Sequence, residues 1–222
     1  MIKVLPSSNP EKEENLLEYA KSIYDMGVEY LHCDVMDGKF VKSTCLDLET
    51  ITNVRNNCNI LLDIHLMVDK PHKIINNYLA IKPNIITVHY EAVKNKRQLK
   101  KLSKLIRSKD IMFGVSIKPN TSVSNLIDLA EYIDLILIMS VEPGKSGQMF
   151  IDSSIQKIKD ARALANNKNI IVEVDGGINL DNYKQIVEAG ADFLVMGNAF
   201  YKASNRQELL NTIDKHYKNK AQ

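Results

Sequence analysis

The chain has 222 residues, of which 45% are apolar and 25% are charged, and its formal net charge at pH 7 is +2. This length suits one large α/β domain or two small ones, and the nearly balanced charge argues against nucleic acid as a partner. No apolar run reaches the roughly 18 residues of a membrane span, and the N-terminus lacks a signal-peptide pattern. The three cysteines form no CxxC pair, so we expect reduced thiols in a cytoplasmic protein.

Short apolar segments rich in β-branched residues alternate with amphipathic segments along the chain. Leu135–Met139, for example, is apolar at every position, which is typical of strands buried on both faces of a parallel sheet. The predicted strands are Ile2–Leu5, Tyr30–Asp34, Ile60–Met67, Ile85–His89, Ile111–Ser116, Leu135–Met139, Ile170–Asp175 and Phe193–Met196.

The segments between the strands carry apolar residues at helical spacing. Gly27 is a plausible end for the first of them, and Pro71 is placed to begin the second. The predicted helices are Glu14–Met26, Pro71–Leu79, Arg97–Ile106, Val123–Ala130, Ser153–Ala165, Leu180–Glu188 and Glu208–His216. No linker rich in Pro, Gly or Ser divides the chain, so residues 1–222 are predicted to form a single domain.

Eight strands alternating with helices fit either a closed (β/α)₈ barrel, the TIM barrel, or an open doubly wound sheet. The polar residues His32, Asp34, His65, His89 and Asp175 all fall at the C-terminal ends of their strands. A barrel gathers those ends into one ring, whereas an open sheet spreads them along a line. No GxGxxG motif follows the first strand, as a dinucleotide-binding sheet would require. The pattern therefore favours the TIM barrel.

His32 and Asp34 are two residues apart, so they point to the same face of their strand. Together with His65 and Asp175 they offer two imidazoles and two carboxylates, a set that suits one divalent ion such as Zn, Fe, Mn or Co. A lone histidine at a strand end is usually a core residue, but this combination favours a metal site with carboxylates available for proton transfer.

Four further residues stand at the ends of the predicted strands. Met36, Met67 and Met139 are either core filler or an apolar wall around a reacting centre. Ser7 follows Pro6 at the end of the first strand, where its hydroxyl could hydrogen-bond a substrate.

Glycine-bearing loops follow the last three strands, and such loops allow backbone N–H groups to close on an anion. Loops after the seventh and eighth strands often bind phosphate in barrels, and no Walker motif points to a nucleoside triphosphate. The residues concerned are Gly144, Lys145, Ser146, Gly147, Gly176, Gly177, Gly197 and Asn198.

At these residues the chain resembles the ribulose-phosphate 3-epimerase family, over nearly its whole length and with the motifs in the family's order. The matching blocks are Pro6-Ser7, His32-x-Asp34-x-Met36-Asp37-Gly38-x-Phe40-Val41, His65-Leu66-Met67-Val68 with Pro71, His89-x-Glu91, Met139-Ser140-Val141-x-Pro143-Gly144, Gly147-Gln148-x-Phe150 and Val174-Asp175-Gly176-Gly177-Ile178.

The resemblance implies a metal-dependent isomerase on a TIM barrel that interconverts D-ribulose 5-phosphate and D-xylulose 5-phosphate in the pentose phosphate pathway. His32, Asp34, His65 and Asp175 would bind the metal. Asp34 and Asp175 would also move protons at C3, through a metal-stabilised enediolate. Ser7, His65 and the methionines would contact the sugar, and the glycine loops would hold its phosphate. A homo-oligomer, dimeric or larger, is implied as well.

The sequence departs from the family in three loops. Ser8-Asn9-Pro10 replaces the usual continuation of the first loop, Lys145-Ser146 stands within the phosphate loop, and Asn198 replaces a serine. Lys145 either adds a charge near the phosphate or faces water. These changes leave the sugar preference open, so the same chemistry on D-allulose 6-phosphate is one alternative. A sugar-phosphate-binding barrel without catalytic activity is another, and the intact Asp34 and Asp175 argue against it.

Overall fold

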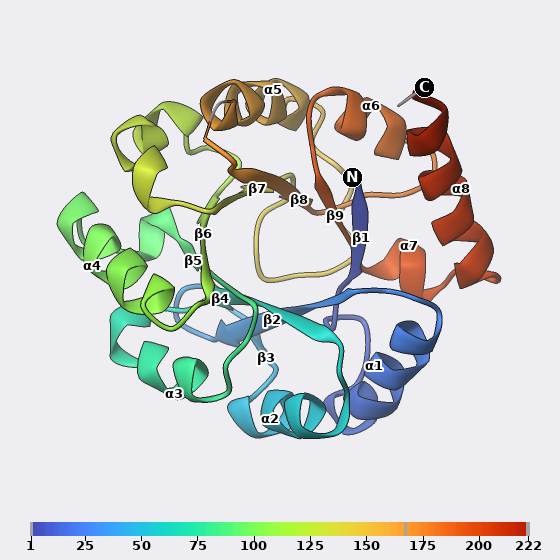
Figure 1. The fold of residues 1–222 in the computed structure, drawn as a ribbon, viewed down its shortest axis with the longest axis horizontal. Helices are drawn as coiled ribbons and strands as arrows, with labels where there is room; N and C mark the ends of the chain where they lie inside the picture. The colour runs from blue at the N-terminus through green and yellow to red at the C-terminus, as the bar shows by residue number, and fades with distance from the viewer. Residues whose placement is uncertain (1, 167, 221–222) are drawn as a thin grey trace.

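Within residues 2–166 and 168–220, which the computed structural model describes, eight parallel strands form a ring surrounded by helices (Figure 1). The TIM barrel predicted from the sequence is thus confirmed. The strands, each within three residues of its predicted bounds, are β1 (Lys3–Pro6), β2 (Tyr30–Asp37), β4 (Leu61–Met67), β5 (Ile85–His89), β6 (Met112–Ile117), β7 (Leu135–Met139), β8 (Ile171–Asp175) and β9 (Phe193–Met196). The short β3 (Thr44–Cys45) pairs antiparallel with the end of β2.

The sheet closes between its first and second strands. Its strand order is β1-β9-β8-β7-β6-β5-β4-β2-β3, and an isolated parallel bridge joins Ser7 to His32. The Ser8 N–H donates to the His32 carbonyl oxygen at 2.8 Å, and the Asp34 N–H donates to the Ser8 Oγ at 3.1 Å. These bonds form a seam, Ser7-Ser8 against His32–Asp34, which turns the curved sheet into a barrel.

Helices cover the outside of the barrel, and their buried faces carry the apolar spacing seen in the sequence. They are α1 (Leu16–Asp25), α2 (Leu48–Asn57), α3 (Ile75–Ala80), α4 (Lys96–Arg107), α5 (Ser154–Ala165), α6 (Tyr183–Glu188), α7 (Asn198–Tyr201) and α8 (Arg206–Lys220). Among the described residues, none of these helices is both long and apolar enough to cross a lipid bilayer.

Two segments differ most from the helices predicted from the sequence. The structure adds α2, which buries Ile51 and Val54 and begins at the N-cap Asp47, whose side chain accepts from the Thr50 N–H at 2.7 Å. With so small an apolar face, α2 leaves a weak periodic signal. The segment Val123–Tyr132 is a 3₁₀ helix, although an ordinary helix is predicted for it.

The inward faces of the strands change character along the barrel axis. At the N-terminal end, Tyr30 and Ile85 pack in an apolar cluster with Phe193. Two residues further along β2, β4 and β8 lie His32, Asp63 and Glu173, and two further again lie Asp34, His65 and Asp175. Because side chains alternate between the two faces of a strand, all of these point into the barrel. The side chains inside the barrel therefore change from apolar to ionisable toward the C-terminal ends of the strands, where the site lies.

Gly114 gives a direct test of packing inside the barrel. A Cβ atom at this position would lie 2.1 Å from the Oγ1 of Thr87 on the neighbouring strand. We expect Gly114→Ala to lower the free energy of unfolding by about 1–3 kcal/mol because the interior is already filled.

Urea unfolding of a double-mutant cycle measures this contact. The cost of Gly114→Ala should be smaller in a Thr87→Ala background, because the clashing hydroxyl is gone. An equal cost in both backgrounds would show that the contact with Thr87 is not its cause.

Candidate active site and metal centre

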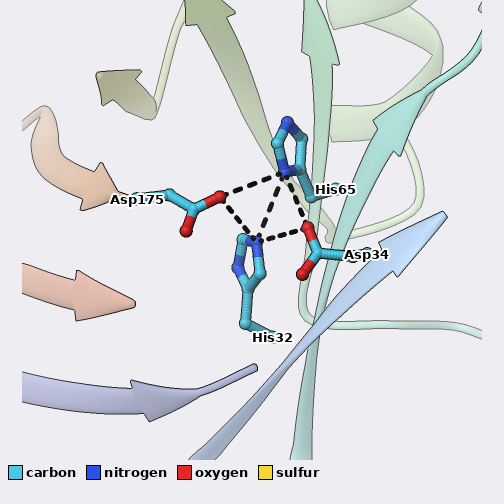
Figure 2. Close-up of side chains that lie close together, drawn as sticks. All are labelled: His32, Asp34, His65 and Asp175. Atoms are coloured by element: carbon cyan, nitrogen blue, oxygen red, sulfur yellow. Dashed lines mark hydrogen bonds and ion pairs between the residues drawn. The ribbon is translucent and has the colours of Figure 1, made fainter. Parts of the chain in front are cut away.

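Three strands supply the four side chains predicted to bind a metal. In the parallel register of β2 and β4, His32 lies opposite Asp63, and Asp34 lies opposite His65. Asp175 ends β8, opposite Met139 of β7. Figure 2 shows that the ring nitrogens of His32 and His65 lie between the carboxylates of Asp34 and Asp175. The structure thus brings together all four residues.

The ligand atoms of these residues converge on one point, all within 4.8 Å of one another. His32 Nε2 lies 3.3 Å from His65 Nδ1 and 3.5 Å from Asp34 Oδ1. His65 Nδ1 lies 3.3 Å from Asp34 Oδ1. Asp175 Oδ2 is 4.0 Å from the His32 nitrogen and 3.9 Å from the His65 nitrogen.

These spacings fit a bound divalent ion. Bonds of about 2.0–2.2 Å place the ligands of a tetrahedral metal about 3.3–3.6 Å apart. The spacings among His32, His65 and Asp34 fall in or next to this range, and Asp175 is a few tenths of an ångström further out. Two imidazoles and two carboxylates also form a donor set that Zn and related metals accept. The His/Asp cluster is therefore a potential metal-binding site.

A carboxylate below the cluster orients His32. The Nδ1 of His32 lies 2.6 Å from the Asp63 Oδ2, and Glu173 Oε1 lies 3.6 Å from the same nitrogen. An ionised carboxylate only accepts hydrogen bonds, so Nδ1 carries a proton and Nε2 is the ring nitrogen that faces the cluster. Such carboxylate–histidine pairs commonly orient metal ligands.

Burial and charge set the protonation of the cluster. Burial opposes ionisation of Asp34, but the charge of His32 and its hydrogen bond hold the pKa of Asp34 well below the usual range. Burial likewise opposes charge on His32, yet Asp63 and Asp34 raise its pKa well above its usual value. Burial and the charge of Asp34 raise the pKa of Asp175 to about 6. The two aspartates thus differ in proton affinity.

Ser7 belongs to this site as well as to the barrel seam. Its Oγ donates to the Oδ2 of Asp34 at 2.7 Å and accepts from the Asn9 N–H at 3.0 Å. The bond to Ser7 leaves Oδ1 as the oxygen of Asp34 that faces the histidines.

A cavity of about 530 Å³ opens above the cluster. Asp34 and Asp175 line its floor, and His32 and His65 are fully buried beneath it. All the predicted substrate-binding residues except His65 line this cavity: Ser7, Met36, Met67, Met139, Gly144, Lys145, Ser146, Gly147, Gly176, Gly177, Gly197 and Asn198.

The glycine loops approach one another closely on one side of the cavity. Gly177 has a φ of +66°, and a Cβ there would lie 2.4 Å from the backbone nitrogen of Phe150 in the loop after β7. Only glycine permits this approach. Within that loop, the Gln148 Nε2 donates to the carbonyl oxygens of Glu142 and Lys145 at 2.6 and 2.8 Å, which ties its two ends together.

Several residues at the site are absent from the set predicted from the sequence. Asn9, Met149 and Lys202 line the cavity, and Met149 is 89% exposed. Asp63 and Glu173 lie beneath the cluster, fully buried. Each stands two residues before a predicted site residue, and this two-residue spacing could have identified both. Lys202 follows α7, and no motif marks it.

Comparisons with known proteins identify a matching family and several relatives of the chain. The sequence profile of the ribulose-phosphate 3 epimerase family matches residues 3–201. The chain is 34% identical over 216 residues to a ribulose-phosphate 3-epimerase of Bacillus subtilis, covering 96% of this chain and 98% of the relative. It is 33% identical over 212 residues to a chloroplastic ribulose-5-phosphate-3-epimerase of Arabidopsis thaliana, covering 95% of this chain and 75% of the relative.

Solved structures of other enzymes share the fold at low identity. A 3-hexulose-6-phosphate synthase superposes with a TM-score of 0.66 at 16% identity, covering 95% of this chain and 94% of the other. A thiamine phosphate pyrophosphorylase from Pyrococcus furiosus gives 0.63 at 13% identity, covering 96% and 94%. These likenesses concern the barrel alone, whereas the profile and the curated relatives carry the family: the chain belongs to the ribulose-phosphate 3-epimerase family, a family of isomerases.

Proposed function

We propose that the protein is a metal-dependent epimerase that interconverts D-ribulose 5-phosphate and D-xylulose 5-phosphate. The observation that carries the proposal is the placement of Asp34 and Asp175 on opposite sides of the paired histidine nitrogens, at the floor of the cavity (Figure 2). Inversion at C3 removes a proton from one face of that carbon and returns a proton to the other. Two carboxylates that flank the substrate from opposite sides could perform both transfers.

His32, Asp34, His65 and Asp175 would hold the metal ion. Zn, Fe, Mn and Co all suit this donor set. When bound, such an ion supplies Lewis-acid stabilisation for the negative charge that develops on the sugar oxygens beside C3.

The two aspartates suit the two halves of the reaction because their proton affinities differ. Asp34 is held ionised by the charge of His32, so it is able to accept a proton. Asp175, with a pKa of about 6, is able to hold a proton near neutral pH and to give it up. Ser7 fixes the Oδ2 of Asp34 and thereby the direction in which that carboxylate faces.

The remaining walls of the cavity suit the rest of a sugar phosphate. Met36, Met67 and Met139 give an apolar surface beside the reacting carbon. The glycine loops after β7, β8 and β9 would bind the phosphate through backbone N–H groups. Lys145 and Lys202 line the same cavity and would add positive charge to it.

A coupled assay tests the substrate and the metal together. The chelator-treated protein should be inactive, and Zn, Mn, Fe or Co should restore xylulose 5-phosphate formation from ribulose 5-phosphate. Faster turnover of D-allulose 6-phosphate would favour the hexulose alternative. No turnover of either sugar with any of these metals would contradict the proposal and favour a non-catalytic binding barrel.

Substitution of either aspartate tests the proton transfers. Asp34→Asn and Asp175→Asn should each lower incorporation of deuterium at C3 from D₂O by at least about 100-fold, because an amide cannot relay the proton. Asp160→Asn, an equivalent change at an exposed position on α5, serves as the control. Exchange at the wild-type rate in both site variants, with the fold intact by circular dichroism, would refute the assigned roles.

The raised pKa of Asp175 also predicts a pH-dependent stability. Its folded value of about 6 exceeds the unfolded value near 3.9, so the unfolding free energy of the metal-free protein falls as pH rises between about 4 and about 6. Metal-free Asp175→Asn, which lacks this charge, should be more stable than wild type by on the order of 2–3 kcal/mol at pH 8. Urea unfolding with chelator should show this difference shrinking at pH 4, and a pH-independent difference would contradict the assignment.

A further inference from the structure

A second buried chain of side chains leads away from the cluster, from His65 through His89 to Glu91. The Nε2 of His65 lies 2.9 Å from the Nε2 of His89, which ends β5. The Nδ1 of His89 lies 3.3 Å from the Oε2 of Glu91, in the 3₁₀ turn that follows. His65 and His89 are both fully buried, so water does not compete for these nitrogens.

The far end of this chain is held firmly. The other oxygen of Glu91, Oε1, accepts from the Lys118 N–H at 2.8 Å and from the Thr121 hydroxyl. Burial opposes the ionisation of Glu91, but the hydrogen bond from His89, together with those from Thr121 and Lys118, holds its pKa at about 2. The Phe40 ring packs 4.7 Å from the ring of His89 on one side, and the His65 ring stacks at 5.0 Å. These contacts fix the positions of the Glu91 carboxylate and of the His89 ring beside it.

The charge of Glu91 fixes the direction of every hydrogen bond in the chain. An ionised carboxylate only accepts, so the Nδ1 of neutral His89 must carry the proton and its Nε2 must be bare. A bare Nε2 on His89 requires the proton of His65 to lie on Nε2. The Nδ1 of His65 then turns a lone pair toward His32, Asp34 and Asp175.

We propose that Glu91 is a positioning residue of the metal centre, which acts through His89 to keep the Nδ1 of His65 free of its proton and able to bind the ion. This inference rests on the proposed metal-dependent function. The two histidine ligands would thus be oriented by different means. His32 contacts its carboxylate, Asp63, directly, whereas His65 contacts Glu91 through a second imidazole.

The substitution Glu91→Gln should reverse the direction of the hydrogen bonds that run from residue 91 through His89 to His65. Lys118 and Thr121 both donate to the Oε1 position, so the amide oxygen of Gln would take that place and its NH₂ group would face His89. The Nδ1 of His89 would then accept, its Nε2–H would donate to His65, and the proton of His65 would move to Nδ1. A proton at that atom competes with the metal, and we expect Zn²⁺ affinity to fall about 10–100-fold.

Two measurements test this on the full chain. The first is competition for Zn²⁺ with a chromophoric chelator, applied to wild type, Glu91→Gln and the matched control Glu131→Gln, whose carboxylate is exposed on the neighbouring 3₁₀ helix. The second is long-range ¹H–¹⁵N spectroscopy of chelator-treated protein at pH 8, which shows which ring nitrogens of His65 and His89 carry protons. A role in folding alone would not move those protons between nitrogens.

Support requires a wild-type protein with protons on His89 Nδ1 and His65 Nε2, a reversed pattern with weaker Zn²⁺ binding in Glu91→Gln, and unchanged binding in Glu131→Gln. Protons on the opposite nitrogens in wild type would overturn the inference even if Glu91→Gln failed to fold. Equal Zn²⁺ affinity of folded Glu91→Gln and wild type would overturn the inference about Glu91 but not the proposed metal centre. No Zn²⁺ binding by wild type would overturn the proposed metal centre as well.

Discussion

The structure of the site depends on the parallel register between β2 and β4. This register places Asp34 opposite His65 and His32 opposite Asp63, all on the inward face of the barrel. Because side chains alternate along a strand, a shift of one residue would turn one strand's set outward, into the helices. The apolar outward residues, such as Cys33 and Ile64, prevent that shift because they are fully buried against the helical layer. The packing of ordinary core residues thus determines the position of the reactive ones.

The same register concentrates ionisable groups where water is excluded. Asp34, Asp63 and Glu173 are buried together with His32, and burial with the charge of Asp63 raises the pKa of Glu173 well above its usual range. Unpaired buried charge is costly, so such a group of residues is retained only where something offsets it. A divalent ion among His32, His65 and the two site aspartates would supply that offset. The ion that offsets the electrostatic cost within the barrel would then be the same ion that takes part in the proposed chemistry at its mouth.

Much of this site could be predicted from the sequence. Its reactive residues are His and Asp side chains on otherwise apolar strands, and residues two positions apart on a strand point to the same face. His32, Asp34, His65 and Asp175 were found in this way, and the structure brings them together. Other features depend on contacts that sequence spacing does not report. The hydrogen bond from Ser7 to Asp34 spans 27 positions, and the bond from Thr121 to Glu91 spans 30. Helix α2 was missed because Ile51 and Val54 are its only buried residues among those described.

The seam that closes the barrel also has a consequence for how the protein loses its function. Ser7 and Ser8 join β1 to β2 through His32 and Asp34, so the bonds that complete the ring are made by the residues of the site and their nearest neighbours. Local opening of a protein begins where few bonds hold two elements together. If the ring opens first at this seam, the site is dismantled while the other seven strand pairings persist. Inactivation would then precede unfolding, and activity would report the integrity of the ring more sensitively than any measure of overall helix content.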